Sequence, residues 1–488
     1  MIAMTLDDLA AVTGGVVVAP PDVDPDALVV DGPVVTDSRE AGPGGLYVAR
    51  LGQHADGHDF AQAAVQQGAV AALVTRAVDG VPCVVVPDTQ EAFAALAREV
   101  VRRVPGLEVV GITGSSGKTS TKDLLGAVLG AAGPTVAPVG SYNSEVGVPL
   151  TVCRVSSETR FLVVEMGARG VGHIAYLTRI APPRIGVVLN VGTAHVGEFG
   201  SREAIARAKA ELVEALPPDG LAVLNADDAA VRRMAAATSA AVLLVGEADD
   251  ADLRASDILL EATGRPTFTV HTADGTCRLH LQLVGRHHVG NALAVLGVAL
   301  ELGMPLEQAC AAVESARATS RWRMEVTQRA DGVTVVNDAY NANPDSMRAA
   351  LTVLERMGEG SRTWAVLGTM LELGEEAVAL HAEVGAEVVA RGVDQLVVVG
   401  PDAAPLAAGA REAAGTREAA GAAEPVGTAS GLVAGRMTHV REVADVDEAE
   451  RLLRAELRPG DVVLFKSSRD AGLRLLGDRL AGPREEHA

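Results

Sequence analysis

A glycine-rich loop between a predicted strand and a predicted helix constrains the fold more than any other feature of the sequence. The strand-like run 109–112 leads into Gly114-Ser115-Ser116-Gly117-Lys118-Thr119-Ser120, and a helix is expected to begin near Thr121. In such a loop, backbone N–H groups and a helix N-terminus hold phosphate, the lysine reaches the β and γ phosphates, and the Thr119 hydroxyl binds Mg²⁺. The spacing departs from the strict G-x-x-x-x-G-K-[ST] pattern because position 112 is Ile. A glycine turn with a surface lysine is the alternative, which the flanking strand and helix disfavour.

Short apolar, β-branched runs alternate with longer alanine-rich segments of helical spacing along the chain. These runs lie at 84–86, 109–112, 161–164, 185–189, 365–367, 396–399 and 462–465. Such runs are typical of parallel strands that are buried on both faces and connected by helices. The predicted fold class is therefore α/β, built from parallel sheets.

The length of 488 residues suggests three domains, at ~150 residues per domain. A helix predicted over 91–103 ends at Pro105-Gly106, which places the first boundary near residue 105. A second change follows the helical segment 292–314, where the chain passes Ser320 and becomes strand-like at 333–336. The expected domains are 1–105, 106–319 and 320–488.

Charge and cysteine usage exclude several classes of function. Lys and Arg total 42 against 63 Asp and Glu, and the net charge of −21 disfavours binding to nucleic acid or to an anionic membrane. The N-terminus is acidic where a signal peptide needs basic residues, and no apolar run approaches the ~20 residues of a membrane span. The cysteines at 83, 153, 277 and 310 form no C-x-x-C pair and read as buried thiols in a reducing compartment. A cytoplasmic protein with no membrane insertion is expected.

Two further polar residues are expected beside the glycine-rich loop. Glu165 ends the strand 161–164, at the edge of an open α/β sheet where ligands bind and where a carboxylate can hold Mg²⁺. His195 lies just beyond the next strand and reaches the same edge. Each residue alone could be structural, a surface acid or a core imidazole, but their convergence on one loop favours a site. Lys209, on a predicted helix, reads by default as part of a solvated face.

Six segments in this order resemble the Mur ligases of peptidoglycan synthesis. They are Gly111-Ile112-Thr113-Gly114-x-x-Gly117-Lys118-Thr119, Glu165-Met166-Gly167, Asn190-Val191-Gly192-x-x-His195, Ala208-Lys209-x-Glu211, the run 285–292 and Asp338-Ala339-Tyr340-Asn341-Ala342-Asn343-Pro344. The resemblance covers nearly the whole chain. Within the family, the run 337–347 is similar to that of the member that adds a terminal dipeptide.

The resemblance implies an ATP-dependent ligase that joins D-alanyl-D-alanine to UDP-N-acetylmuramoyl-tripeptide through an acyl phosphate. It implies a small α/β domain for the UDP-substrate, a central P-loop domain, and a Rossmann-like C-terminal lid whose closure gates turnover. A monomer with ATP and two Mg²⁺ ions is expected. Another Mur-type ligase or a folylpolyglutamate synthetase-like enzyme is the alternative within the enzymes. A P-loop module that only switches conformation is the alternative outside them.

The resemblance also implies roles for individual residues. Lys118, Glu165, His195 and Lys209 are the expected catalytic residues, and Lys209 would be carbamylated to support a second Mg²⁺. Thr119, Glu165 and His195 would bind metal, while the loop 114–120 would bind ATP. The remaining roles are Asn291 at adenine, Arg323 at phosphate and Asp338 at ribose, and substrate contacts from Ser38, Arg39, His54, Asp56, His58, Asn143, Tyr340, Asn341 and Asn343.

Three features of the C-terminal third are less specific. Thr369 stands where the family usually has an acid before methionine, so a role for that side chain is in doubt. An Ala/Gly-rich insertion at 411–434 is expected at the surface, away from the site. Lys466-Ser467-Ser468-Arg469 could contact phosphate or carboxylate, or could be a solvated strand end.

Overall fold

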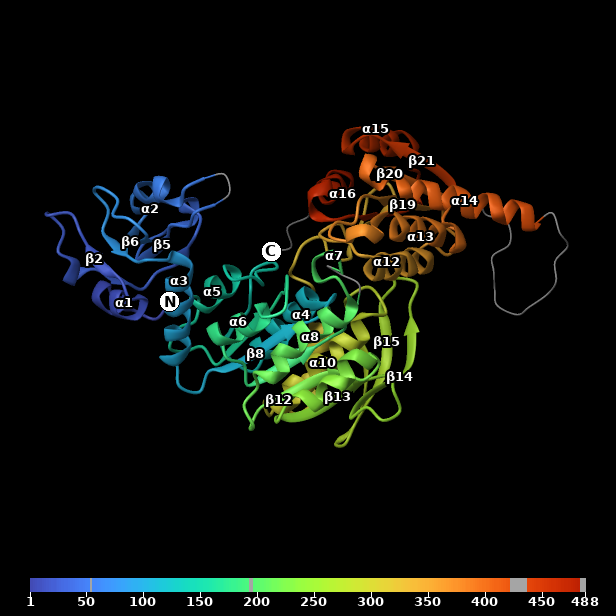
Figure 1. Cartoon of the computed structure of the whole chain (residues 1–488). Coiled ribbons are helices and arrows are strands. Elements are labelled where there is room, and N and C mark those ends of the chain that lie inside the picture. The colour runs from blue at the N-terminus through green and yellow to red at the C-terminus, as the bar shows by residue number, and fades with distance from the viewer. Residues whose placement is uncertain (53–54, 193–195, 422–436, 483–488) are drawn as a thin grey trace.

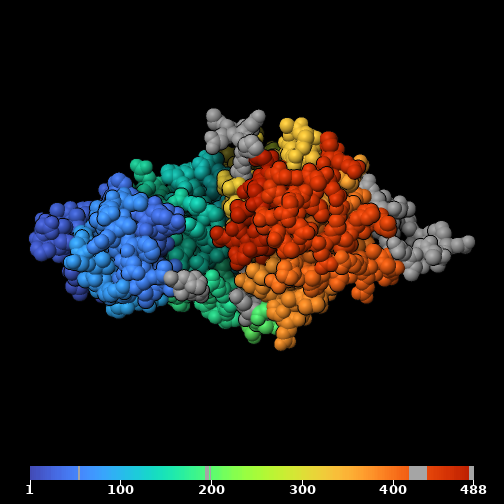
Figure 2. All heavy atoms as spheres, turned by 90° about the horizontal axis from the view of Figure 1, so that it is seen from above, coloured from blue at the N-terminus to red at the C-terminus, as the bar shows by residue number. Residues whose placement is uncertain are grey.

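Three sheet-bearing parts follow one another along the chain and in space. The computed structural model describes residues 1–52, 55–192, 196–421 and 437–482. Figure 1 shows the N-terminal part in blue at one side, the central part in green, and the C-terminal part in orange and red above it. From above, the molecule is elongated, with the N-terminal part at one end and the C-terminal part toward the other (Figure 2). The α/β class in three parts is as predicted. The boundaries proposed near 105 and 319 fall between α3 and β8 and between α11 and β17.

The N-terminal part holds a five-stranded sheet of order β2-β7-β6-β5-β4 and a two-stranded antiparallel sheet of β1 and β3. The β4-β5-β6-β7 pairs are parallel, and β2 pairs antiparallel with β7. Its elements are β1 Met4–Thr5, α1 Leu6–Thr13, β2 Val16–Val18, β3 Val29–Val30, β4 Val34–Val35, β5 Gly45–Val48, α2 Ala61–Gln66, β6 Ala69–Val74, β7 Cys83–Val85 and α3 Thr89–Arg102.

Helix α3 joins the N-terminal part to the central part. Its residues Phe93, Leu96 and Val100 are fully buried in a core that continues through Val109 into the central sheet. Two polar contacts cross the same junction: Gln90 Nε2 donates to the Glu145 carbonyl and the Tyr176 hydroxyl to Glu91. The N-terminal part is therefore packed onto the central part and not merely tethered to it.

The central part is a nine-stranded sheet of order β16-β15-β14-β13-β12-β11-β8-β10-β9. It is parallel from β9 to β14 and antiparallel at β15 and β16. Its strands are β8 Glu108–Thr113, β9 Thr135–Val136, β10 Phe161–Glu165, β11 Ile185–Val188, β12 Leu221–Asn225, β13 Ala241–Gly246, β14 Leu253–Leu260, β15 Pro266–Thr272 and β16 Gly275–His280. Its α-helices are α4 Lys118–Gly130, α5 Gly147–Val152, α6 His173–Ile180, α7 Val196–Phe199, α8 Arg202–Glu214, α9 Ala229–Arg232, α10 His288–Glu301 and α11 Leu306–Ser315.

Alternate residues of each central strand enter two different cores. Leu162 and Val164 of β10 pack into the core that reaches α6 and α8, whereas Val163 packs into the core under α4 and α10. Because side chains of a strand alternate between faces, only a strand that is apolar at every position can fill both cores. That explains the continuous apolar runs. Strand β8 lies between β10 and β11, which is the switch point of the sheet order where open α/β sheets bind ligands.

The C-terminal part is a six-stranded sheet of order β17-β18-β22-β19-β20-β21, parallel except for the antiparallel pair of β17 and β18. Helices cover both faces (Figure 1). Its elements are β17 Glu325–Gln328, β18 Thr334–Asn337, α12 Pro344–Met357, β19 Thr363–Leu367, α13 Ala377–Ala390, β20 Gln395–Val399, α14 Ala404–Gly421, β21 His439–Val443, α15 Val446–Glu456, β22 Val462–Lys466 and α16 Leu473–Ala481.

Two helix predictions were wrong in detail. Helix α4 begins at Lys118 instead of near Thr121, because Gly117 adopts a left-handed φ of +82° as its N-cap and the loop turns directly into the helix. The segment 292–314 is two helices, α10 and α11. Gly303, with a φ of +84°, ends the first and Pro305 precedes the second, a stop-and-start signal that was present in the sequence.

The expectation of four unpaired thiols was also wrong. Cys277 on β16 and Cys310 on α11 form a disulfide, while Cys83 and Cys153 are free and buried. A pairing across 33 residues leaves no local spacing signal, because it depends on α11 packing beside β16. The spacing argument excluded only C-x-x-C sites.

Part of the Ala/Gly-rich insertion is helical. Residues 411–421 of this insertion lie within α14, which projects from the C-terminal part in Figure 1, whereas 422–434 lies outside the described residues. Among the helices of the described residues, none has the length and apolar character that a membrane span requires.

Candidate active site

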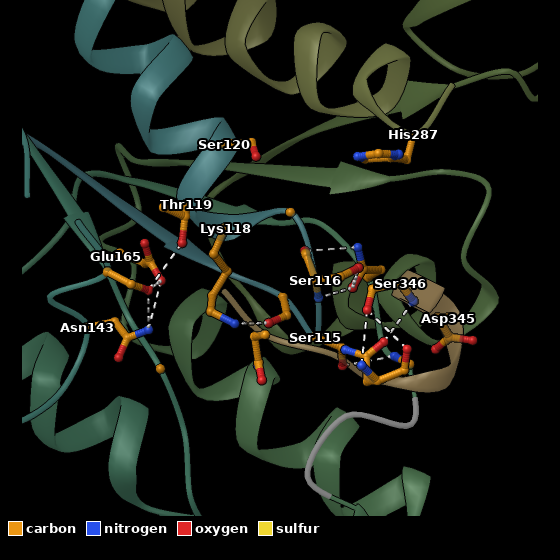
Figure 3. A pocket seen from close by; sticks show the side chains of 18 of the residues that line it. Ser115, Ser116, Lys118, Thr119, Ser120, Asn143, Glu165, His287, Asp345 and Ser346 are labelled. Carbon is orange, nitrogen blue, oxygen red and sulfur yellow. Dashed lines mark hydrogen bonds between the residues drawn. The ribbon is translucent and has the colours of Figure 1, made fainter. Parts of the chain in front are cut away.

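The main cavity lies between the central and C-terminal parts, at the carboxyl ends of β8, β10 and β11. Its volume is about 800 Å³, and it is lined by the glycine-rich loop, by residues that follow neighbouring strands, and by the first residues of the C-terminal part. Figure 3 shows Lys118 and Thr119 at the start of α4, Glu165 and Asn143 on one side, and Asp345 and Ser346 on the other. The structure therefore brings two domains to one polar site.

Asn190 holds the glycine-rich loop in shape. The Ser115 N–H donates to the Asn190 carbonyl at 3.1 Å, and the Ser116 N–H donates to Asn190 Oδ1 at 2.9 Å. Asn190 Nδ2 donates back to the Ser116 carbonyl at 3.2 Å. Gly117 has a left-handed φ of +82°, which strains a residue with a side chain, and a Cβ there would also lie 2.9 Å from Oδ1 of Asn291. Asn190 is not among the predicted site residues, although its position just after β11 places it at the ligand-binding edge of the sheet.

Lys118 points along the inside of the loop. Its Nζ donates to the Gly114 carbonyl at 2.7 Å, where a phosphate-binding lysine is expected (Figure 3). Burial lowers the pKa of Lys118, the Glu165 carboxylate opposes this shift, and Arg323 adds to it. Ser120 and Thr119 follow on the first turn of α4, and both are buried. The loop thus presents N–H groups, hydroxyls and one amine to the same space.

Glu165, the last residue of β10, is fully buried beside that loop. Its Oε1 accepts hydrogen bonds from Ser141 Oγ at 2.9 Å and Asn143 Nδ2 at 2.7 Å, and Ser141 Oγ lies 3.1 Å from Thr119 Oγ1. Its Oε2 is buried and has no hydrogen-bond partner among the described residues. A buried carboxylate oxygen without a donor, next to a threonine hydroxyl, fits the oxygen ligands of Mg²⁺.

No group of three or more His, Cys, Asp or Glu suited to a metal gathers anywhere in the described ranges. A site with one carboxylate and one hydroxyl fits a cation that takes its other ligands from phosphates and water, as Mg²⁺ does at nucleotide sites.

Lys209 is buried, which contradicts the default interpretation of a solvated helix face. Helix α8 turns this residue toward the cavity while Ala208 and Leu212 enter the core, and the exposed fraction of Lys209 is 5%. Burial lowers the pKa of Lys209 well below its usual value, and the positive charge of Lys118 lowers it further. Lys209 lies four residues after Ile205 and four before Val213, both buried, so the helical spacing of the apolar residues was the signal that it belongs to the buried face.

Arg323 reaches the site from the C-terminal part. Its Nη2 donates to Thr119 Oγ1 at 3.2 Å, and its guanidinium lies 4.3 Å from the ring centre of Tyr340. Tyr340, Asn341 and Asn343 line the same cavity, as does Asn143 from the central part. Asn343 also caps α12 by accepting from the Ser346 N–H, which directs the N-terminus of that helix toward the loop.

Asp338 and Lys466 form a buried ion pair at the cavity wall. Lys466 Nζ lies 2.5 Å from Asp338 Oδ2, and Asp338 Oδ1 accepts from the Met324 N–H at 3.0 Å. Burial lowers the pKa of Lys466 while Asp338 opposes the shift. Lys466 is 2% exposed, so the alternative of a solvated strand end was wrong.

The candidate substrate residues of the N-terminal part lie apart from this cavity. Asp56 bonds to His58 Nδ1 at 2.6 Å and to Arg76 at 2.7 Å, and the Thr75 N–H donates to His58 Nε2. Arg39 is exposed and pairs with Asp37, while Ser38 is buried at a short 3-10 turn. Two candidates, His54 and His195, lie outside the described residues.

Besides the contact of Arg323 with Thr119, two hydrogen bonds join the central and C-terminal parts. Beside the cavity, the Gly197 N–H donates to the Glu372 carbonyl at 3.2 Å. Farther out, Arg356 Nε on α12 donates to the Leu260 carbonyl at 3.0 Å. The C-terminal part is thus seated on the central part, with Arg323 and Asp345 facing the loop.

Comparisons with known proteins agree with this arrangement. Family models match at residues 33–111 (Mur ligase family, catalytic domain), 112–299 (Mur ligase middle domain) and 322–469 (Mur ligase, glutamate ligase domain). UDP-N-acetylmuramoyl-tripeptide--D-alanyl-D-alanine ligases of Mycobacterium bovis and Mycobacterium tuberculosis are each 47% identical, over 98% of this chain and 98% of theirs. The Escherichia coli enzyme of the same name is 36% identical over 82% of this chain and 86% of its own.

Solved structures show the same architecture. A MurF crystal structure from Acinetobacter baumannii superposes with a TM-score of 0.83 at 30% identity, covering 98% of this chain and 99% of that one. MurF ligase from Thermotoga maritima in complex with ADP superposes with a TM-score of 0.75 at 29% identity, covering 91% and 96%. With family models matching along most of its length and relatives this similar, the chain belongs to the Mur ligase family.

Proposed function

We propose that this chain joins D-alanyl-D-alanine to UDP-N-acetylmuramoyl-tripeptide, with conversion of ATP to ADP and phosphate, in peptidoglycan synthesis. The observation that carries the proposal is a single cavity in which the glycine-rich loop, Glu165 and Lys209 of the central part meet Arg323 and Tyr340 of the C-terminal part. The names of the 47% identical relatives supply the substrates.

The chemistry explains why such a cavity is needed. A carboxylate is a poor acyl donor, so its oxygen first attacks the γ-phosphorus of ATP, the bond to the β-phosphate oxygen breaks, and ADP leaves. The dipeptide amine then attacks the carbonyl carbon of the acyl phosphate, loses a proton, and expels phosphate from the tetrahedral intermediate. Both steps bring negative groups together, so they require cationic and N–H groups held in place beforehand. Neither step requires a side-chain nucleophile.

The loop and its neighbours would supply those groups. The backbone N–H groups of 114–120 would hold the ATP phosphates, Lys118 would neutralise the β and γ phosphates, and Arg323 would approach the transferred group from the other domain. Thr119 and Glu165 would hold Mg²⁺, which supplies charge neutralisation and orients the phosphates. Asn291, packed against the loop, would lie at the adenine, and Asp338 at the ribose.

Carbamylation of Lys209 fits its surroundings. Carbon dioxide adds to a neutral amine, forming an N–C bond with loss of a proton, and burial favours the neutral amine of Lys209. The resulting carboxylate would support a second Mg²⁺, together with His195. Depletion of CO₂ should lower the activity of the wild-type chain, and added bicarbonate should restore it. Lys209→Ala should lose activity that bicarbonate cannot restore; a response of this variant to bicarbonate would remove the carbamate from the mechanism.

The remaining substrate groups would bind on either side of the cavity. Ser38, Arg39, His54, Asp56 and His58 would hold the UDP-sugar on the N-terminal part, and Asn143 would contact the peptide between the parts. Tyr340, Asn341 and Asn343 would receive the dipeptide. We further infer that the chain works as a monomer in the cytoplasm, where ATP is supplied.

A phosphate-release assay separates this function from that of a nucleotide switch. ADP and phosphate should form only when both a UDP-muramoyl tripeptide and D-alanyl-D-alanine are present, with the UDP-pentapeptide detected by mass spectrometry. ATP turnover that is indifferent to both substrates would support the switch. A panel of UDP-muramoyl peptides with diaminopimelate or lysine at the third position would then identify the acceptor.

A further inference from the structure

The segment that connects the central part to the C-terminal part lies along the helix of the phosphate loop. After α11 ends at Ser315, residues 316–324 pass beside α4 and deliver Arg323 to Thr119. Asp123 lies one helical turn beyond Thr119 and faces the same segment. Its carboxylate accepts three hydrogen bonds: from Thr319 Oγ1 at 2.9 Å, from the Ser320 N–H at 2.9 Å and from Ser320 Oγ at 3.0 Å.

The Asp123 carboxylate is itself fixed in place. Lys122 Nζ lies 2.5 Å from Asp123 Oδ1 and donates to the Pro138 carbonyl at 2.8 Å. Both side chains are almost fully buried, with exposed fractions of 3% for Lys122 and 1% for Asp123. A buried carboxylate is retained only where cations and donors satisfy it, and here three of the four partners of the carboxylate come from the connecting segment.

The hydrogen bonds of Asp123 to Thr319 and Ser320 are called the anchor below. The backbone that follows the anchor in the chain is strained. Trp322 and Met324 have φ values of +59° and +52°, which are sparsely populated by residues other than glycine. These two residues flank Arg323, and the structure describes only two other non-glycine residues with positive φ. A strained backbone conformation of this kind persists only where surrounding contacts hold it in place. Downstream, the Met324 N–H donates to Asp338 and the Trp322 indole N–H donates to Asp478, both in the C-terminal part.

Ser320 is therefore bound to the central part, whereas the residues that flank Arg323, Trp322 and Met324, are bound to the C-terminal part. Upstream the segment is bound to α4 through Asp123, and downstream it is bound to the C-terminal sheet through Asp338. Because Asp123 and Thr119 belong to one rigid helix, the distance between the anchor and the Arg323 target does not change when the domains move. Because Arg321 Nη2 also donates to Asp478 of the C-terminal part, at 2.7 Å, any change of angle between the domains falls on the junction of Ser320 and Arg321.

We propose that Asp123 is a positioning residue: it binds the interdomain segment to the phosphate-loop helix and so determines where Arg323 meets the transferred phosphate, with the junction of Ser320 and Arg321 as the hinge. This inference rests on the proposed ligase function for its kinetic consequence. Asp123 touches neither substrate nor phosphate in this role. Its effect should therefore appear in kcat and in the accessibility of the segment, and not in the binding of the UDP-substrate on the N-terminal part.

The first test removes the hydroxyls that bind Asp123 and leaves the core helix unchanged. Thr319→Val combined with Ser320→Ala keeps the buried Lys122–Asp123 pair, so the fold should persist. We expect kcat to fall by roughly tenfold to 10²-fold, the scale of a misplacement of about 1 Å, with the KM for the UDP-peptide within about twofold of wild type. Ser315→Ala is the matched control, because that hydroxyl donates to the Ala312 carbonyl within α11.

The second test measures how firmly the connecting segment is held, by its rate of trypsin cleavage and independently of activity. Arg317 and Arg321 are exposed trypsin sites in the segment. In the double variant and in Asp123→Ala, cleavage after these residues should accelerate several-fold relative to wild type and to Ser315→Ala, as followed by mass spectrometry. Asp123→Glu, which keeps a carboxylate, should recover most of the protection and most of kcat.

The outcomes separate this inference from the proposed function. If the wild-type chain forms no UDP-pentapeptide, the proposed function fails, and trypsin cleavage still decides whether Asp123 holds the segment. If trypsin cleaves the double variant at the wild-type rate, the proposal that Asp123 holds the connecting segment is wrong. Faster cleavage with a wild-type kcat overturns its role in positioning Arg323.

Discussion

Arg323 and Thr119 lie in different domains, yet Nη2 of the arginine donates a hydrogen bond to Oγ1 of the threonine at 3.2 Å. Thr119 stands on the first turn of the phosphate-loop helix and is linked through Ser141 to the buried carboxylate of Glu165. The contact therefore connects the C-terminal part with the residues proposed to hold Mg²⁺ and phosphate. A site completed only when two domains meet can exclude water from an acyl phosphate.

Replacement of Arg323 should slow the phosphoryl step. Arg323→Lys retains the charge but loses the planar fork that can contact two oxygens, so kcat should fall by roughly 10²-fold, the effect of removing one preorganised donor of about 3 kcal/mol. Single-turnover measurements of ADP formation would detect the loss. Arg317→Lys, a replacement at an exposed position of the same segment, is the control. An unchanged rate for Arg323→Lys would exclude Arg323 from the reaction.

Glu165→Gln tests the metal site with little change in volume. The glutamine oxygen can still accept from Ser141 and Asn143, but an amide nitrogen then replaces the unpartnered Oε2. We expect the Mg²⁺ concentration for half-maximal activity to rise and kcat to fall on the order of 10²-fold. Titration of activity with Mg²⁺ measures both quantities. Glu158→Gln, at an exposed position before the same strand, should behave as wild type, and so would Glu165→Gln if this carboxylate had no metal role.

Lys209→Met should abolish activity and still stabilise the protein without ligands. The folded-state pKa of Lys209 lies well below 10.5, so between these two pKa values the unfolded chain binds a proton that the folded chain does not. Stability therefore rises with pH across that window, and methionine removes the cost of burying the amine. We expect a gain of roughly 0.5–2 kcal/mol at pH 7, a gain that shrinks toward pH 10.

Thermal unfolding of both chains at pH 7 and pH 9.5, in CO₂-depleted buffer, measures this difference. Arg207→Met, on an exposed position of the same helix, is the control and should show no comparable gain. A lower melting temperature for Lys209→Met at pH 7 would contradict the burial of an uncharged amine.

Alkylation should find two free cysteines that are protected by burial and two that are joined in a disulfide. Burial raises the pKa of the Cys153 thiol to about 12 and also raises that of Cys83, so neither should react with iodoacetamide in the folded chain. Mass spectrometry after denaturation should show two alkylated thiols without reductant and four with it. Reduction should cost about 3–4 kcal/mol of stability on the chain-entropy estimate for a loop of 33 residues. Four thiols alkylated without reductant would refute the Cys277–Cys310 disulfide.

The sequence alone determined those features that depend on neighbouring residues. Continuous apolar runs identified strands such as β8, β10 and β22, because a strand buried on both faces must be apolar at every position. The glycine-rich loop predicted a phosphate site, because the chemistry of such a loop is local: Gly117, Lys118 and Thr119 are consecutive. The position of Glu165 beside that loop was predicted for the same reason, because it is the polar residue at the end of such a strand.

Tertiary structure decided everything that depends on which segments meet. Helix α8 places Lys209 beside Lys118, and α11 places Cys310 against Cys277, and neither neighbour could be predicted from the sequence around it. Asp123 gave no signal in the sequence, because its partners lie almost 200 residues later, at Thr319 and Ser320. A disulfide or a buried ion pair forms where segments that are distant in the sequence meet. The sequence pattern of one such segment does not show which other segment will pack against it.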